Sequence, residues 1–167
     1  MLHHRFLRWS GLFLCSSLLL ACSSYGPPAG LTGMSRDEVV ARMGPPDMTR
    51  QMYTGSRLEF ARGPLGKQTW FVDFDAAGRA IRAEQVLTEQ NFNRIQVGMT
   101  QGVVLELLGK PHEVQVLGRG RGAVWGYRYE NYVCQWFQIE LTLEQQVRSA
   151  GYGVSPECAR LEDHSAR

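Results

Sequence analysis

The chain has 167 residues and a formal charge of +2 at pH 7. Two of its arginines lie in an N-terminal segment that we expect to be removed, which leaves 146 residues with 16 basic and 16 acidic side chains. This balance argues against nucleic acid as a partner, and the length suits one compact domain or two small, closely packed repeats.

The N-terminal segment has the three parts of a secretory signal. Its first nine residues carry Arg5 and Arg8, an apolar run covers residues 11–20, and a small alanine precedes Cys22. The apolar run has about ten residues, whereas a membrane-spanning helix needs roughly 20. We therefore expect residues 1–21 to be a signal peptide.

The end of this segment, Leu19-Leu20-Ala21-Cys22, looks like a bacterial lipobox. In that pattern the cysteine becomes the acylated first residue of the mature protein, so Cys22 is the predicted lipidation site, with palmitate among the expected acyl chains. The alternative is an ordinary signal peptide that happens to be followed by a cysteine. Ser23 is not the aspartate associated with inner-membrane retention, which favours the outer membrane, with the protein facing the periplasm. Residues 22–32 are rich in Ser, Gly and Pro and are typical of a tether.

A helix motif occurs twice after the tether. Residues 33–46 (GMSRDEVVARMGPP) and 98–111 (GMTQGVVLELLGKP) match at an offset of 65 residues. In each copy a Ser or Thr can cap a helix N-terminus, and Ser35 with Glu38 forms a capping box. Apolar residues follow at helical spacing, and a glycine, expected in the left-handed conformation, ends the helix shortly before a proline. We interpret the pattern as two copies of one supersecondary unit.

The first copy, residues 33–87, is predicted to continue as a sheet. After the helix, short extended segments alternate with turns that contain Gly, Pro or Asp. The expected strands are Thr49–Tyr53, Arg57–Ala61, Thr69–Phe74 and Ala80–Val86. In the third strand Trp70 and Phe74 alternate with Phe71 and Asp73, so we expect it to be buried mainly on one side.

The second copy, residues 88–155, is predicted to have the same plan. A short helix over Thr88–Ile95, capped by Thr88, leads into the repeated helix motif. The strands expected after it are Glu113–Leu117, Ala123–Tyr129, Tyr132–Leu141 and Val147–Tyr152. Residues 156–167 form a polar C-terminal tail. The predicted fold class is α+β, with two tandem repeats that each pack short helices on one face of an antiparallel sheet.

Few residues of the mature chain suggest catalysis. Its histidines, His112 and His164, have neither an adjacent nucleophile nor a recognised metal-ligand spacing, so we expect no enzyme, no cofactor and no metal site. Cys134 and Cys158 are its only cysteines besides Cys22. In an exported protein such a pair favours a disulfide, which would contribute ~3 kcal/mol, and a pair of free or metal-binding thiols is the alternative.

The lipobox, the two G-M-[ST]-x3-V-x3-[ML]-G-x-P helices and the hairpins that follow resemble the SmpA/OmlA (BamE-like) family of small outer-membrane lipoproteins. The resemblance covers nearly all of residues 33–152. It implies an accessory subunit of the machinery that inserts β-barrel proteins into the outer membrane, or a role in envelope integrity. Its partners would be outer-membrane assembly subunits or another envelope protein, and its N-terminal lipid would hold it to the membrane.

The duplication departs from this family, whose assembly subunit has a single copy of the unit. A tandem of such units is also the architecture of the secreted β-lactamase inhibitory proteins, which bind an enzyme through a concave aromatic sheet. The alternative function is therefore a periplasmic inhibitor or ligand-binding module that uses its aromatic sheet surface.

Two groups of side chains are candidates for partner binding. Arg119 and Arg121 lie in a GRGRG hairpin and could meet lipid phosphates or an acidic partner, although a solvated turn is the simpler interpretation. Tyr127, Tyr129 and Tyr132 are large amphipathic side chains of the kind that dominate interfaces.

The tryptophans are expected in the core instead. Trp70-Phe71 recurs as Trp136-Phe137, and Ile81-Arg82 as Val147-Arg148, both at an offset of 66 residues. This equivalence indicates a shared packing role for the two tryptophans.

Overall fold

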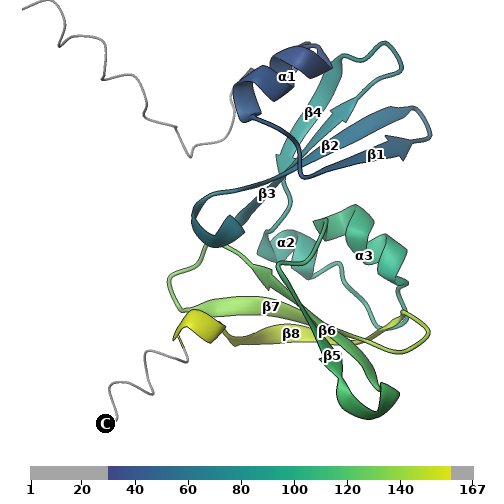
Figure 1. The fold of residues 1–167 in the computed structure, drawn as a ribbon, viewed down its shortest axis with the longest axis vertical. Coiled ribbons are helices and arrows are strands. Elements are labelled where there is room, and N and C mark those ends of the chain that lie inside the picture. Colours follow the sequence, from purple (N-terminus) through teal and green to yellow (C-terminus); the bar gives the residue numbers. More distant parts are fainter. Residues whose placement is uncertain (1–29, 159–167) are drawn as a thin grey trace, which may run out of the picture.

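The computed structural model describes residues 30–158, which form two four-stranded antiparallel sheets with short helices (Figure 1). In each sheet the strands lie side by side in the order in which they occur along the chain, β1-β2-β3-β4 and then β5-β6-β7-β8. The predicted α+β fold is confirmed. The expected signal peptide and most of the tether lie outside the described residues, as does most of the C-terminal tail.

The first unit contains one helix, four strands and a short 3₁₀ turn. Its elements are α1 Arg36–Met43, β1 Met48–Met52, β2 Gly55–Arg62, η1 Pro64–Gly66, β3 Gln68–Phe74 and β4 Ala80–Gln85. The strand ends lie within one or two residues of the predicted ones, because the Gly-containing turns between them interrupt the alternation of apolar residues.

The second unit adds one short helix to the same plan. Its elements are α2 Glu89–Phe92, α3 Gln101–Leu108, β5 Glu113–Leu117, η2 Gly118–Gly120, β6 Gly122–Arg128, β7 Gln135–Leu141 and β8 Val147–Val154. Strand β7 begins at Gln135 rather than at the predicted Tyr132. The cause is Asn131, whose side-chain oxygen accepts hydrogen bonds from the N–H groups of Val133 (3.1 Å) and Gln135 (3.0 Å) and so holds the intervening residues in a turn.

Helices α1 and α3 begin as their motif predicts but end differently. Ser35 and Glu38 form the predicted capping box on α1, and Thr100 caps α3. The glycines after the last turns, Gly44 and Gly109, have φ of +79° and +74° with ψ of −175° and −164°. This is a positive-φ conformation with extended ψ that is essentially restricted to glycine, rather than the left-handed helical one that we expected.

The two sheets correspond at an offset of 67 residues, not 66. The irregularity in pairing at Phe74 of β3 recurs at Leu141 of β7. Gly55 and Gly122, which open β2 and β6, are separated by the same interval. Strands β1 and β5 keep the offset of 65, so the two additional residues of the second unit lie in the hairpin that contains η2.

This shift places Trp136 on the opposite face of its sheet from the one that Trp70 occupies. Successive side chains of a strand point to opposite faces, so an alignment error of one residue exchanges them. Trp70 lies in the core with residues of α1, and the corresponding core position of β7 is held by Phe137. The expectation that the two tryptophans share a packing role is therefore wrong.

Two apolar clusters form the interior, and β3 contributes to both. The first comprises Leu31, Val39, Leu58, Phe60, Trp70, Val72, Phe74 and Ala80. On the other side of β3, Phe71 is 3% exposed and belongs to the cluster of the second unit, together with Phe92 of α2 and Val104 of α3. Strand β3 is thus buried on both sides rather than mainly on one, because the second unit covers the face that would otherwise meet water.

Candidate functional site

The predicted lipidation site, Cys22, lies outside the described residues. The described part of the chain begins eight residues later, at Gly30, and leads into α1. Within residues 30–158, no helix combines the length and the apolar character that crossing a membrane requires.

Of the three tyrosines predicted to bind a partner, Tyr132 alone lies on the surface. It is fully exposed, whereas Tyr127 and Tyr129 are 0% and 4% exposed. The hydroxyl of Tyr127 donates a hydrogen bond to the Gly109 carbonyl (3.1 Å), and burial raises its pKa because the phenolate would be poorly solvated. Tyr129 packs edge-on against Phe92, with ring centroids 5.1 Å apart. The interface prediction is wrong for these two, because Tyr127 in β6 and Tyr129, just after it, both lie in the core with residues of α2 and α3.

Arg119 and Arg121 lie in the hairpin between β5 and β6, and both are exposed. Arg121 donates a hydrogen bond from Nε to the Gly118 carbonyl (3.2 Å), within its own turn. The seven residues of β6 separate this hairpin from Tyr132, a distance of about 20 Å along the strand. The structure therefore does not bring the two predicted binding groups together.

The predicted aromatic binding surface is also absent from the outer face of the second sheet, the face that points away from α2 and α3 (Figure 1). The aromatic residues of β6 lie in the core instead. Trp136 is on the outer face, yet it is only 8% exposed, because its ring lies over Gly126, where an added Cβ would be 2.3 Å from it. The guanidinium of Arg128 is 5.9 Å from the ring centroid.

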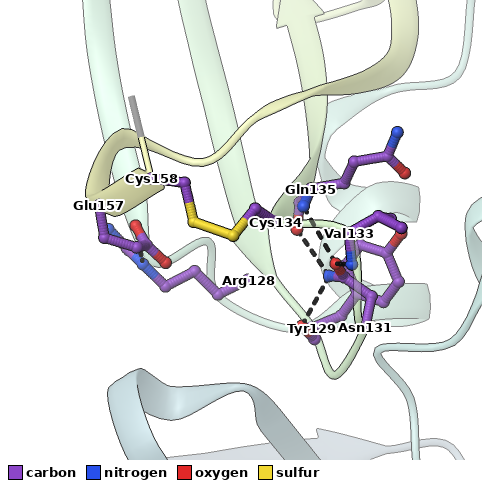
Figure 2. Close-up of a disulfide and its surroundings, with 8 residues drawn as sticks. All are labelled: Arg128, Tyr129, Asn131, Val133, Cys134, Gln135, Glu157 and Cys158. Atoms are coloured by element: carbon purple, nitrogen blue, oxygen red, sulfur yellow. Dashed lines mark hydrogen bonds and ion pairs between the residues drawn. A yellow bond between two sulfur atoms is a disulfide. The ribbon is translucent and has the colours of Figure 1, made fainter. Parts of the chain in front are cut away.

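Cys134 and Cys158 are joined in a disulfide, with Cα atoms 6.1 Å apart (Figure 2). The predicted disulfide is thus present, and the alternative of free thiols is not. The N–H of Ser155 donates to the Cys134 carbonyl (2.8 Å), and Glu157 forms an ion pair with Arg128 (3.5 Å). These contacts fasten the C-terminal turn to the end of β6 and to the residue that precedes β7.

A small pocket of about 80 Å³ lies beside the disulfide. Its lining includes Lys67 and Tyr132. Ligand pockets usually measure roughly 300–1,000 Å³, so this hollow has room for a few water molecules. In the described part of the chain, no three His, Cys, Asp or Glu side chains gather where they could hold a metal ion.

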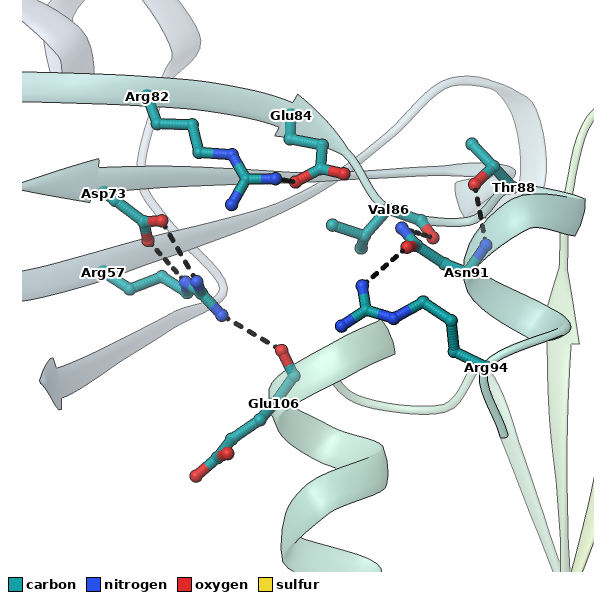
Figure 3. Close-up of polar contacts among 9 residues, drawn as sticks. All are labelled: Arg57, Asp73, Arg82, Glu84, Val86, Thr88, Asn91, Arg94 and Glu106. Atoms are coloured by element: carbon teal, nitrogen blue, oxygen red, sulfur yellow. Dashed lines mark hydrogen bonds and ion pairs between the residues drawn. The ribbon is translucent and has the colours of Figure 1, made fainter. Parts of the chain in front are cut away.

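One contact between the two units centres on Arg57 of β2 (Figure 3). Its guanidinium pairs with both carboxylate oxygens of Asp73, at 2.6 and 3.1 Å, and donates to the Glu106 carbonyl of α3 (3.1 Å). The same group lies over the Phe71 ring, 4.3 Å from its centroid. The Glu106 carbonyl is one of the last four of its helix and lacks a partner within it, so Arg57 both satisfies it and meets the negative end of the helix dipole.

His112 forms a second link between the units. Its Nε2 contacts the Gly66 carbonyl of the first unit, and its Nδ1 accepts a hydrogen bond from the Arg128 N–H (3.2 Å). An accepting Nδ1 carries no proton, so the ring is neutral and Nε2 is the donor. Burial lowers the pKa of His112, the Gly66 contact opposes this, and the Arg128 charge lowers the pKa further. Nearby, Gln68 donates to Glu130 across the same boundary (2.9 Å).

The segment that joins the sheets is buried as well. Val86 and Leu87 are each 2% exposed. Asn91 donates to the Val86 carbonyl (3.0 Å) and accepts from Arg94 (3.1 Å), and Thr88 caps α2 (Figure 3). Packing and hydrogen bonds therefore hold the connection between the units.

Sequence reasoning missed these contacts between the units. Phe71 offered a signal, because a large aromatic residue on an otherwise polar strand face indicates a second covering surface. His112 was considered only as a catalytic or metal-binding residue. Arg57 offered no signal, since a charged residue in an alternating strand is normally solvated.

No protein-family model matches the sequence, and no curated protein does. Among solved structures, a candidate osmotically inducible lipoprotein, OsmE, matches with a TM-score of 0.35 and 21% identity, over 49% of this chain and 93% of its own. A candidate β-lactamase inhibitor protein from Streptococcus mutans matches with a TM-score of 0.34 and 9% identity, over 72% and 83%.

An extracellular protein with an SCP domain from Bacillus anthracis matches with a TM-score of 0.32 and 11% identity, over 82% of this chain and 48% of its own. This chain therefore spans about half the length of that protein. With TM-scores of 0.35 or lower, these likenesses carry no weight in the proposals that follow.

Proposed function

We propose that the chain is a lipid-anchored envelope protein that acts by contact with other proteins and not as an enzyme. The observation that carries the proposal is the lipobox-like Leu19-Leu20-Ala21-Cys22, which stands eight residues before the first residue that the structure describes. Several acyl chains, at about 0.8 kcal/mol per buried CH₂, make a firm anchor. A body on so short a tether acts close to the membrane surface.

The finer proposal is a role at the periplasmic face of the outer membrane, in β-barrel assembly or envelope integrity. The resemblance of the two helix motifs to the SmpA/OmlA family supports it, as does Ser23 in place of an aspartate. Outer-membrane assembly subunits or another envelope protein would be the partners.

The way in which the two units are joined suits a protein that presents surfaces to a partner. Arg57, Phe71 and His112 each bridge the units, and all three are largely buried. A body held in this way loses little conformational entropy on binding, which favours association. We propose no cofactor for this role.

The experiment is a mild crosslink in whole envelopes, followed by purification of the protein and identification of what it holds. The Cys22→Ala variant is the matched control, because it keeps the whole folded body and loses the anchor. Assembly subunits recovered with the anchored form alone would support the proposal. A soluble enzyme recovered equally with both forms would contradict it and favour the inhibitor alternative, in which the lipid only sets the location.

A further inference from the structure

Two loops meet on one side of the molecule, at the boundary between the two units, and the apolar side chains at their tips are exposed. The loops are η1 and the turn between β6 and β7, which lie side by side in Figure 1. Gln68, just after η1, donates a hydrogen bond to Glu130 in the turn (2.9 Å). Leu65 of η1 is 62% exposed, and in the turn Val133 is 66% and Tyr132 fully exposed. We call Leu65, Tyr132 and Val133 the tip residues.

The turn that carries Tyr132 is held in place from within. Asn131 donates from Nδ2 to two backbone carbonyls, at 2.7 and 3.1 Å, and its Oδ1 accepts from the N–H groups of Val133 and Gln135 (Figure 2). The disulfide at Cys134 fixes the far end of the turn. Tyr132 is therefore presented outward by an ordered turn.

Leu65 is held outward at a conformational cost. Its φ of +58° and ψ of 19° place it in the left-handed helical region. That region costs a residue with a Cβ roughly 1–2 kcal/mol, and glycine is the usual occupant. Because the side chain is mostly exposed, packing within the chain offsets little of this cost, whereas contact with an external surface would.

The described part of the chain begins on the same side of the molecule. A Cβ added to Gly30 would be 4.0 Å from Nη1 of Arg42, in the last turn of α1. The carbonyl of the next residue, Met43, accepts hydrogen bonds from Arg62 at 2.7 and 3.1 Å, and Arg62 ends β2 just before η1. The eight residues from Cys22 to Gly30 reach at most ~27 Å. A lipidated Cys22 therefore keeps this side of the body near the bilayer.

We propose that the tip residues dock into the headgroup region of the membrane that holds the N-terminal lipid, an inference that rests on the proposed lipidation. Tyrosine suits this region because its ring is apolar and its hydroxyl is polar. The charges beside the tips include Lys67 and Glu130, which have opposite signs. Burial of apolar surface rather than net charge drives this docking, so it does not require an anionic lipid.

The test compares two leucines that are almost equally exposed at distant places on the molecule. Leu65 is 62% and Leu143 64% exposed. Leu143 lies between β7 and β8, beside Gly120 of η2, at the far end of the second sheet from the tips. The mature, lipidated protein would carry Leu65→Cys or Leu143→Cys, labelled with an environment-sensitive fluorophore. With Cys22 acylated and the native disulfide intact, the introduced cysteine is the single free thiol.

Each labelled protein is bound to vesicles of phosphatidylethanolamine and phosphatidylcholine. We expect a blue shift, and at least twofold quenching by lipids with a nitroxide at headgroup depth, at position 65 and neither effect at position 143. Adding Tyr132→Ser should weaken the quenching at position 65, whereas phosphatidylglycerol should leave it unchanged.

Three results would overturn the inference, and they differ in what they say of the anchor. Equal emission at both positions, on protein that co-sediments with the vesicles, would refute the docking and leave the anchor intact. Wild-type protein that does not co-sediment would refute the lipidation and the docking together. Shielding of position 65 by added envelope proteins but not by vesicles would assign the tips to a protein partner.

Discussion

Replacing Phe71 with alanine should make the two units unfold separately. Phe71 extends from the first sheet into the core of the second unit, where it is 3% exposed, and the guanidinium of Arg57 lies 4.3 Å from its centroid. Removing a buried Phe side chain costs about 3–5 kcal/mol, and the lost cation–π contact adds about 1 kcal/mol. A unit of about 60 residues is only marginally stable alone. A loss of this size therefore removes most of the interaction free energy that makes the two units unfold together.

The matched control is Phe60→Ala. Phe60 is 0% exposed and also has an arginine over its ring, Arg62 at 5.0 Å, but it lies within the core of the first unit. Both variants should lose several kcal/mol of stability in urea. Tryptophan fluorescence and hydrogen exchange resolved by unit should give one transition for the wild type and Phe60→Ala, and two for Phe71→Ala. A single transition in Phe71→Ala, coincident for both probes, would refute the reasoning.

Two further predictions concern His112 and the outer face of the second sheet. Burial lowers the pKa of His112 in the folded protein, so as the pH falls the unfolded chain protonates this histidine before the folded chain does. The contribution of His112 to stability is therefore full above about pH 6.5 and declines as the pH falls below that value. Lowering the pH from about 7.5 to 5.5 should therefore decrease the urea midpoint of the wild type, and should decrease that of His112→Gln less. An NMR titration that placed the His112 pKa above its ordinary value would contradict this prediction. Gly126→Ala should destabilise the protein by about 1–3 kcal/mol, because the new Cβ would be 2.3 Å from the Trp136 ring. The control is Gly151→Ala, whose new Cβ would have nothing within 4 Å, so this variant should be neutral or slightly stabilising. Equal thermal midpoints for Gly126→Ala and Gly151→Ala would show that the Trp136 ring does not lie over Gly126.

Local rules predicted the elements of this fold well. The Ser35 capping box and the glycine that ends each motif helix bounded α1 and α3, and Gly-containing turns bounded the strands. These signals act over three to five residues, so they survive whatever packs around them. The shortened start of β7 is one exception, because its cause is the specific hydrogen bonding of Asn131. Helix α2 is another, because it ends at Phe92 and not at the predicted Ile95.

Features that depend on residues far apart in the sequence were harder to predict. Matching Trp70 with Trp136 at an offset of 66 relied on identity of residue type, whereas the structure aligns the sheets at 67 through the bulge and the opening glycine. With a side-chain period of two, that single residue reversed the predicted face. Reliance on residue type also explains why Tyr127 and Tyr129 were predicted to lie at an interface, although both are buried.

The candidate site was predicted in part. The pairing of Cys134 with Cys158 and the exposure of Tyr132 agree with what the sequence indicates. The neighbourhood of Tyr132 and Leu65 could not be predicted, because it depends on how the second unit packs against the first, through contacts such as that of Gln68 with Glu130.

The most direct test of the anchored-protein account is the mass of the N-terminal peptide of the protein purified from membranes. The account predicts that the mature chain begins at Cys22 and that this residue carries a diacylglyceryl group and a further acyl chain such as palmitate. A chain that retains residues 1–21, or one that begins at Cys22 with an unmodified thiol, would contradict it.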